Sequence, residues 1–387
     1  MTASPQVPAA TAPDRAATVT RTVLAVVGVL AVVVFALSSP FFLSVDNLVN
    51  LLDDIAVTGI LAVPVTFLVM SGHVDLSVGA VAAFTGIVVG ATAPEVGLPV
   101  AVLLGVATGA VVGLVNGLVV TVGGVDSLAT TFAAMALLRG LAYWVPSGLA
   151  VAVSGFRALG GAGPVLGLSV PTLVFAGLAV LGGALSVTAV GRDARAVGAL
   201  PAATRLDAPR ERRWVLGLFV VTGLAAALDG LVRTSQLGTG LPTSATGVEV
   251  VVLAAVLFGG GRLGGGRGSV GGTVLAVAVV AVIDNGLSLA NVTAYAAQVF
   301  HAALLVLALV LDRSRRRPRR SAARRAAARA AASGAGAGAG GADGSGAEAV
   351  GAGGAGAAVR AVAADGAADA AVDPAALDGR VDAEAGR

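Results

Sequence analysis

Long hydrophobic runs separated by short polar breaks extend along most of the chain. A membrane-spanning helix needs about 20 predominantly apolar residues to cross a hydrocarbon core of roughly 30 Å, and ten runs approach that length. They predict helices at residues 22–39, 55–70, 76–93, 100–122, 128–145, 173–190, 214–231, 248–258, 270–283 and 294–311. The second, eighth and ninth runs are short for full spans, so eight spanning helices with re-entrant segments are the alternative.

The composition places this pattern in a membrane. Of 387 residues, 56% are hydrophobic and only 12% are charged, and the mean hydropathy is +0.91. The 55 glycines and many alanines favour close approach of membrane helices. The predicted fold class is therefore all-α, a polytopic transmembrane helical bundle. Cysteine is absent and the two histidines are far apart in sequence, so we expect no disulfide, metal site or cofactor.

Arginine placement predicts the orientation, because short cytoplasmic loops carry an excess of positive charge. With ten spans and an internal N-terminus, the inside receives Arg15 and Arg21, the arginines of residues 192–213, the pair Arg262 and Arg267, and the run that begins at Arg313. We therefore expect both termini in the cytoplasm and the protein in the plasma or inner membrane.

Three regions follow from these boundaries. Residues 1–20 form a polar cytoplasmic leader, residues 21–312 form the transmembrane domain, and residues 313–387 form a tail that is first Arg-rich and then rich in Ala and Gly. The tail's composition predicts disorder. Its arginines follow a membrane span directly, so we interpret them as a cytoplasmic anchor that contacts anionic lipid rather than as a nucleic-acid site.

A polar segment interrupts the apolar sequence between the second and third predicted helices. Asp75 or Ser77 can accept the N–H bonds left free at the start of the third helix, and Gly72 and Gly79 permit a break in it. The segment is either a capped helix break beside a pathway or a place of direct solute contact. His73 is interpreted as a polar interfacial residue, with a proton relay as the alternative.

Other polar residues inside or beside the spans are functional candidates because ionisable groups are costly in lipid. Asn116 and Arg139 must face protein or water, and Arg139 either pairs with a carboxylate such as Asp229 or reaches toward the outer surface. Residues 236–243 form an outer loop with amide and hydroxyl groups, or an ordinary Gly/Pro turn. Glu249 is either a pathway residue or an acid at a helix N-terminus.

The glycine-rich residues 259–269 lack the Gly-Lys-Ser/Thr ending that contacts nucleotide phosphates, so we interpret them as a flexible cytoplasmic connection. No Walker motif or catalytic triad is visible in the sequence either. We therefore expect that the chain is not an enzyme.

Several segments together resemble the ribose- and xylose-type permeases of bacterial ATP-binding-cassette (ABC) importers, within the branched-chain amino acid permease superfamily. They are residues 70–79, residues 191–206, residues 236–287 and residues 130–140. The resemblance implies two copies of the permease, cytoplasmic ATPase subunits that hydrolyse ATP, and an external solute-binding protein that delivers a monosaccharide. The alternatives are a branched-chain amino acid or nucleoside permease, or an ion-coupled transporter that uses Asp75 or Asp229.

The resemblance also implies roles for particular residues. The loop from Gly191 to Arg213 holds a short coupling helix that docks on the ATPase, with a simple topology anchor as the alternative. Here Leu200-Pro201 stands where the family usually has Asn. The implied coupling residues are Gly191, Arg192, Ala196, Val197, Gly198, Ala203, Arg205 and Leu206. The expected translocation pathway comprises Asp75, Ser77, Asn116, Gln236, Pro242, Thr243, Glu249 and Asn285.

Overall fold

The computed structural model describes residues 15–160, 168–293 and 295–313. Most of the predicted leader and the tail beyond Arg313 lie outside these residues. The helices are α1 (Arg15–Ser38), α2 (Val45–Met70), α3 (Val78–Val96), α4 (Leu98–Thr121), α5 (Ser127–Trp144), α6 (Val170–Val187), α7 (Ala189–Ala199), α8 (Pro209–Leu237), α9 (Val248–Phe258) and α10 (Val270–Leu289), followed by a C-terminal helix, Tyr295–Arg313.

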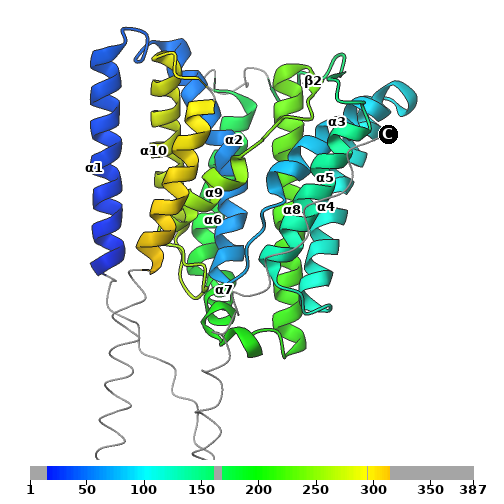
Figure 1. The fold of residues 1–387 in the computed structure, drawn as a ribbon, viewed down its shortest axis with the longest axis vertical. Helices are drawn as coiled ribbons and strands as arrows, with labels where there is room; N and C mark the ends of the chain where they lie inside the picture. Colours follow the sequence, from blue (N-terminus) through cyan, green and yellow to red (C-terminus); the bar gives the residue numbers. More distant parts are fainter. Residues whose placement is uncertain (1–14, 161–167, 294, 314–387) are drawn as a thin grey trace, which may run out of the picture. The chain divides into compact units, whose positions relative to one another are not determined.

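The fold is the predicted all-α membrane bundle. In the described residues, eight helices are long and apolar enough to cross a membrane, while α9 has only 11 residues. The start of α1, helix α7 and the end of the C-terminal helix lie at the same end of the bundle, at the bottom of Figure 1. This arrangement agrees with an internal N-terminus and an internal C-terminus, so we call this end cytoplasmic and the opposite end outer.

Two of the three helices expected to be short are full-length spans. Helix α2 has 26 residues and begins at Val45 instead of Ile55, and α10 has 20. Polar residues lower the hydropathy of the outer part of α2, and two of them, Asn47 and Asp53, have partners inside the bundle. Asn47 exchanges amide hydrogen bonds of 2.9 and 3.0 Å with Asn285, and Asp53 accepts hydrogen bonds from Ser169 and Thr172.

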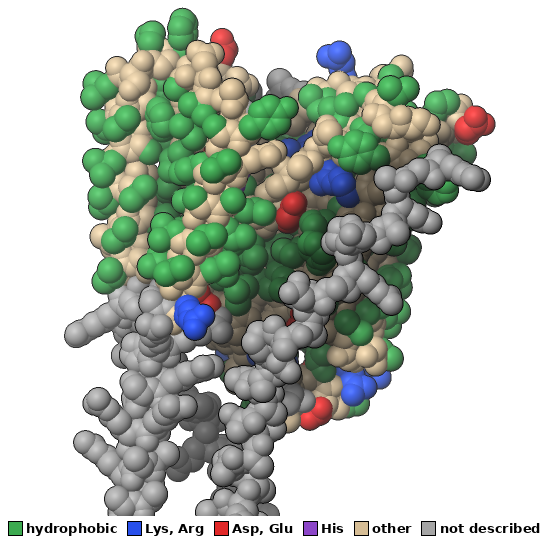
Figure 2. Space-filling view, in the orientation of Figure 1, with side chains coloured by type: hydrophobic (Ala, Val, Ile, Leu, Met, Phe, Trp, Pro, Cys, Tyr) green, Lys and Arg blue, Asp and Glu red, His purple; other side chains and the backbone are tan. Residues whose placement is uncertain are grey.

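The bundle has lipid-facing and protein-facing helices. Only 6% of the apolar span of α1 is buried, and side chains such as Leu37 are exposed, whereas 72% of the corresponding window of α2 is buried. Hydrophobic side chains cover the surface of α1 and the neighbouring helices in Figure 2. Because lipid is as apolar as these side chains, this surface is stable only in a bilayer.

Glycines allow α4 and α8 to pack backbone against backbone. A Cβ at Gly109 would overlap the carbonyl of Gly223, and one at Gly113 would overlap the carbonyl of Phe219. The hydrophobic effect does not drive helices together within lipid. Dispersion between closely packed backbones stabilises the association of α4 and α8 instead. The glycine content therefore has the packing role expected from the sequence.

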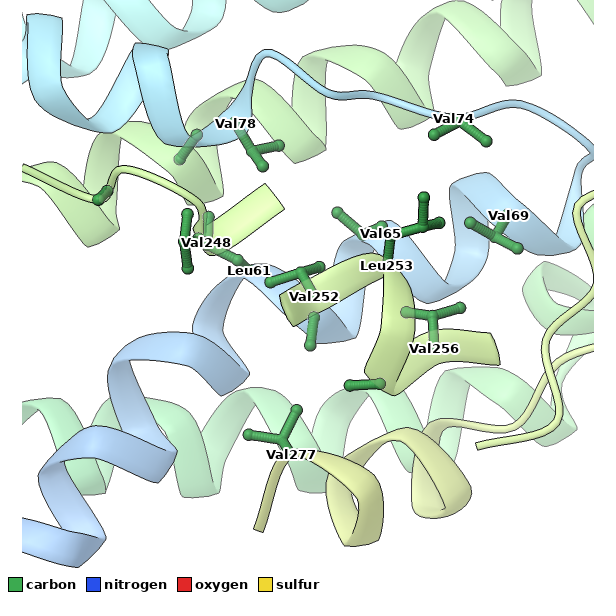
Figure 3. Close-up of a cluster of buried hydrophobic side chains, with 14 of the residues drawn as sticks. Leu61, Val65, Val69, Val74, Val78, Val248, Val252, Leu253, Val256 and Val277 are labelled. Atoms are coloured by element: carbon green, nitrogen blue, oxygen red, sulfur yellow. The ribbon is translucent and has the colours of Figure 1, made fainter. Parts of the chain in front are cut away.

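The centre of the bundle holds α2, α9 and the segment that leads into α3. Figure 3 shows Leu61 and Val65 of α2 beside Val252 and Val256 of α9, with Val78 at the start of α3 close by. The two-stranded sheet of β1 (Val151–Ala152) and β2 (Thr239–Gly240) is antiparallel and lies at the outer end. These elements hold the polar groups described next.

Candidate functional site

The polar break after α2 is an extended strand of backbone inside the bundle. Helix α2 ends at Met70, Gly72 adopts a φ of +83°, and the chain is non-helical from His73 to Leu76 before Ser77 leads into α3 at Val78. The hydroxyls of Ser127 and Thr131 on α5 accept hydrogen bonds from the N–H groups of Val74 and Leu76, at 3.2 and 3.1 Å. Neighbouring side chains thus replace the helical hydrogen bonds that the break removes.

Asp75 is enclosed by protein donors. Its Oδ1 accepts hydrogen bonds from the backbone N–H of Ser77 at 2.8 Å and from the Ser77 hydroxyl at 2.6 Å, while Asn116 donates to that hydroxyl at 3.0 Å. All three residues are buried, with exposed fractions of 5%, 1% and 2%. Ser77 itself makes no capping bond with its side chain. This geometry favours the capped helix break over direct solute contact.

His73 lies at the cytoplasmic end of the break, where Oγ of Ser71 is 3.4 Å from its Nδ1 and the ring of Phe219 is edge-on. Burial, together with the nearby positive charge of Arg205, lowers the pKa of His73 to about 4. The imidazole is therefore neutral at physiological pH, and a proton relay near pH 7 does not fit this environment.

The outer-loop candidates form a second cluster. Arg139 donates hydrogen bonds of 2.9 Å to the carbonyls of Pro242 and Ser244, so its suggested pairing with Asp229 is wrong. Asp229 instead pairs with Arg233 one turn later on α8, at 2.9 Å. In this cluster Arg139 fixes the backbone that Pro242 and Thr243 belong to, and the side chain of Thr243 is exposed.

Glu249 lies in the first turn of α9, and its Oε2 is so close to Gly79 that a Cβ there would overlap it. The carboxylate is therefore near the N-termini of both α9 and α3. Because a helix N-terminus carries partial positive charge, this placement supports the interpretation of Glu249 as a helix-terminal acid.

A polar cavity of about 350 Å³ lies in the outer half of the bundle, between α2, α8, α9 and α10. It brings together two predicted pathway residues, Gln236 and Asn285. The remaining polar lining consists of Asp54, Thr58, Arg233, Asp284 and Ser288. The other predicted pathway residues do not line this cavity.

The cavity offers both acceptors and donors to a small solute. Asp54 and Asp284 supply carboxylates. Arg233 supplies a guanidinium whose Nε bonds to Asp229 and whose other nitrogens have no hydrogen-bond partner within the described part of the chain. Asp284 also has a partner that does not line the cavity, because Nε2 of His301 lies 2.7 Å from its Oδ1. The hydroxyl groups of a solute can donate hydrogen bonds to the carboxylates and accept them from the guanidinium. This lining therefore suits a polyhydroxylated solute.

The cytoplasmic end carries a third assembly, which we call the cytoplasmic junction: the end of α2 with Gly72, helix α7 with Arg205, and residues 259–269. The guanidinium of Arg205 donates to four carbonyls, those of Gly72, Gly198, Leu200 and Gly264, at 3.0 to 3.3 Å. One side chain thus ties three separate segments together. Arg205 is only 8% exposed.

Close backbone packing completes the junction. Gly266 donates its N–H to the carbonyl of Met70 at 2.8 Å, and a Cβ at Gly198 would overlap that same carbonyl. Gly265 has a φ of +78° and packs on Gly198 and Gly72. The glycine-rich segment is therefore a packed part of the junction and not only the flexible connection that we expected.

Helix α7 has one buried and one exposed face, as its short amphipathic sequence requires. The buried residues are Gly191, Ala194, Val197 and Gly198, and the exposed ones include Arg192, Ala196 and Ala199. The spacing of 192, 196 and 199 places these three side chains in one stripe at the cytoplasmic surface. Leu206 accepts a hydrogen bond from Arg212 with its carbonyl, and the side chain of Ala203 lies outside the described residues.

The fold and these clusters can be compared with known proteins. Residues 47–309 match a protein family described as "Branched-chain amino acid transport system / permease component". The chain belongs to this permease family.

Individual relatives are similar over most of their length. The permease is 33% identical over 287 residues to the ribose import permease protein RbsC of Escherichia coli K12, which covers 72% of this chain and 89% of RbsC. It is 32% identical over 326 residues to the L-arabinose ABC transporter permease protein AraH of Azospirillum brasilense, covering 82% and 96%. No solved structure matches the chain. The protein is therefore a multi-pass membrane permease of the ABC type.

Sequence reasoning missed the charged lining of the cavity. Asp54 lies just before the predicted span 55–70 and Asp284 just after the predicted span 270–283, so an apolar pattern left both charged residues outside the helices. Arg233 was placed outside the pathway for the same reason. A usable signal was present, because three ionisable residues lie within a few positions of apolar runs and such groups are expensive in lipid.

Proposed function

We propose that this permease imports a monosaccharide with energy from a separate ATPase, and that the polar cavity holds the sugar on its way across. The observation that carries the proposal is the cavity's lining of two carboxylates, a guanidinium and amides in the outer half of a membrane bundle. The names of the ribose and arabinose relatives support the same class of substrate.

The cytoplasmic junction supplies the route for coupling. The exposed stripe of α7 docks on a cytoplasmic ATPase subunit, and Arg205 transmits the movement of α7 to the end of α2 and to the start of α10 through residues 259–269. Because Asp54 and Thr58 of α2 line the cavity, displacement of α7 that moves the cytoplasmic end of α2 also changes the lining of the cavity. Alternating access then arises from rigid movement of helices around hinge positions.

Import further requires partners. An external solute-binding protein delivers the sugar at the outer end, and two copies of the permease work with two ATPase subunits. The names of the relatives, an import permease and an ABC transporter permease, support the ATPase and the delivery of solute from outside, while the two copies follow from the family resemblance of the sequence. Asp75, Ser77 and Asn116 act in it as the rigid start of α3, and Arg139 with Pro242 fixes the outer loop.

Reconstitution tests the function. The full-length permease is placed in vesicles with its ATPase subunits and binding protein, and uptake of radiolabelled ribose and arabinose is measured. We expect accumulation that requires ATP and all three components, with competition by unlabelled pentoses and none by leucine. Accumulation by the permease alone under an ion gradient would contradict the proposal. Competition by leucine and not by pentoses would show that the substrate is an amino acid instead of a sugar.

A further inference from the structure

An apolar groove of about 500 Å³ opens on the side of the bundle between α2, α6 and α8, away from the polar cavity. Pro64 and Phe67 of α2, Leu181 of α6 and Leu228 of α8 are among the side chains that line it. Gly217 of α8 forms part of the lining, and a Cβ at this position would have no heavy atom within 4 Å. The hollow therefore exists partly because residue 217 has no side chain.

The groove is longer than the hydrocarbon of one lipid leaflet. Along α8 its lining runs from Arg213 to Leu228, 15 residue steps or roughly 22 Å at 1.5 Å per step. The hydrocarbon of one leaflet is about 15 Å thick, half of the whole core. A fatty acyl chain from the cytoplasmic leaflet can therefore lie along the groove over its full depth.

The cytoplasmic end of the groove is polar. Arg213 and Trp214 line both the groove and a second hollow of about 580 Å³, which lies between α7 and the start of α8 and also contains Glu211. Within the described residues, the indole Nε1 of Trp214 and the Oε2 of Glu211 are buried and have no hydrogen-bond partner. Buried donors and acceptors without partners are costly, so a ligand with both kinds of group suits this end of the groove.

The chemistry of that ligand follows from the side chains. The guanidinium of Arg213 and the indole N–H of Trp214 are donors only, which suits a phosphate and ester oxygens. The carboxylate of Glu211 is an acceptor, which suits an ammonium group. A cation at the cytoplasmic surface beside an apolar trough is positioned for the phosphate of a lipid in the cytoplasmic leaflet, whose surface is also negatively charged.

We propose that this groove is a specific site for phosphatidylethanolamine from the cytoplasmic leaflet. One acyl chain fills the trough between α6 and α8, Arg213 and Trp214 bind the phosphate region, and Glu211 accepts hydrogen bonds from the ethanolamine ammonium. The bound lipid packs between α2 and α8, beside the helix α7 of the cytoplasmic junction. Its role is to support the position of these helices during transport.

Native mass spectrometry of the purified full-length permease, with phosphatidylethanolamine titrated in, tests the site. Gly217→Phe fills the trough without a steric conflict, and we expect retention to fall by about tenfold, the equivalent of roughly 1.4 kcal/mol. The matched control is Gly177→Phe, an exposed glycine of α6 that also has open space around its Cβ position and does not line the groove. This control should bind lipid as the unmodified permease does.

Head-group variants test the polar end. Arg213→Gln should weaken retention of every phospholipid by about tenfold, because a charge-assisted contact worth roughly 1.5 kcal/mol is lost. Phosphatidylcholine has no N–H donor, so the unmodified permease should prefer phosphatidylethanolamine to it, and Glu211→Gln should remove that preference.

Two results would overturn the proposal. One is equal lipid retention by Gly217→Phe and Gly177→Phe. The other is dissociation of permease dimers by Gly217→Phe alone, which would assign the groove to a second protein copy.

Discussion

The permease holds a buried arginine, Arg205, and a partly buried one, Arg233, in opposite halves of the bundle, and the two make different contacts. Arg205, at the cytoplasmic junction, places its two terminal nitrogens on four backbone carbonyls from three segments. Arg233, at the outer cavity, commits Nε to Asp229 and lines the cavity with the rest of its side chain. A guanidinium whose terminal nitrogens both bond to backbone carbonyls holds those segments together, although Nε of Arg205 itself has no partner among the described residues. A guanidinium whose terminal nitrogens have no partner among the described residues can instead bind a solute.

Packing also differs between the two regions: the cytoplasmic junction is close-packed and the outer cavity is open. At the junction, Gly198 and Gly265 bring backbones so close that no side chain fits, whereas the cavity keeps about 350 Å³ of space among polar groups. Close-packed regions transmit displacement because they cannot absorb it. The comparison thus separates a region that transmits movement from a region that binds, and it predicts that variants of the two fail differently.

The largest effect is expected at Gly198. In Gly198→Leu, the new side chain overlaps the carbonyl of Met70 and the backbone of Gly266, and overpacking of this kind costs about 1–3 kcal/mol. We expect stimulation of the ATPase by sugar-loaded binding protein to be lost, with membrane insertion unchanged. Gly183→Leu on α6, where a Cβ meets open space, is the control. Normal stimulation in Gly198→Leu would remove α7 from the coupling route.

Arg205→Lys should have the next largest effect. Lysine keeps the charge but has no planar fork, so it cannot satisfy four carbonyls spread over three segments, and each buried carbonyl left without a partner costs about 1–3 kcal/mol. We expect sugar uptake per ATP hydrolysed to fall several-fold while the sugar concentration for half-maximal uptake stays the same. Arg192→Lys, at an exposed position of α7, should behave like the unmodified permease if charge alone matters there.

Variants of the cavity should change the dependence of uptake on sugar concentration and leave ATPase activity unchanged, the reverse of the junction variants. Asp54→Asn and Asp284→Asn each remove a charged acceptor from the lining, and hydrogen bonds to charged groups contribute about 1.5–3 kcal/mol. We expect the sugar concentration for half-maximal uptake to rise about tenfold, with basal ATPase activity unchanged. Asp46→Asn, at an exposed position in the first turn of α2, is the control. A change in ATPase coupling without a change in sugar dependence would contradict the division between the two regions.

The architecture could be predicted from the sequence because a segment that crosses lipid must be an apolar helix of sufficient length. Every helix predicted from an apolar run exists, and the limits of α9 agree to the residue. The errors lie where polar residues enter a span. Asn47 and Asp53 made α2 look short, yet their partners, Asn285 and Ser169, come from distant parts of the chain that no local pattern reveals.

The candidate sites were predicted less completely for the same reason. The resemblance of residues 191–206 to a coupling loop drew attention to Gly198 and Arg205, and both lie at the cytoplasmic junction. It did not reveal that Arg205 reaches Gly72 and Gly264, since those contacts depend on tertiary packing. Likewise, Gln236 and Asn285 were expected in one pathway with Asp75, but the structure places Asp75 in an enclosed cluster with Ser77 and Asn116.

The enclosed position of Asp75 predicts the smallest effect. In Asp75→Asn, the amide oxygen can still accept the N–H and hydroxyl bonds from Ser77, because a neutral carbonyl has the same acceptor geometry. We expect less than about a twofold change in half-maximal sugar concentration, while Asp75→Leu, which leaves buried donors without an acceptor at roughly 1–3 kcal/mol, should lower thermal stability of the purified permease. If Asp75→Asn instead weakened sugar dependence as strongly as Asp54→Asn, the carboxylate itself would contact the solute. The binding region would then extend from the outer cavity to the start of α3, and the distinction between an enclosed helix break and an open cavity would no longer hold.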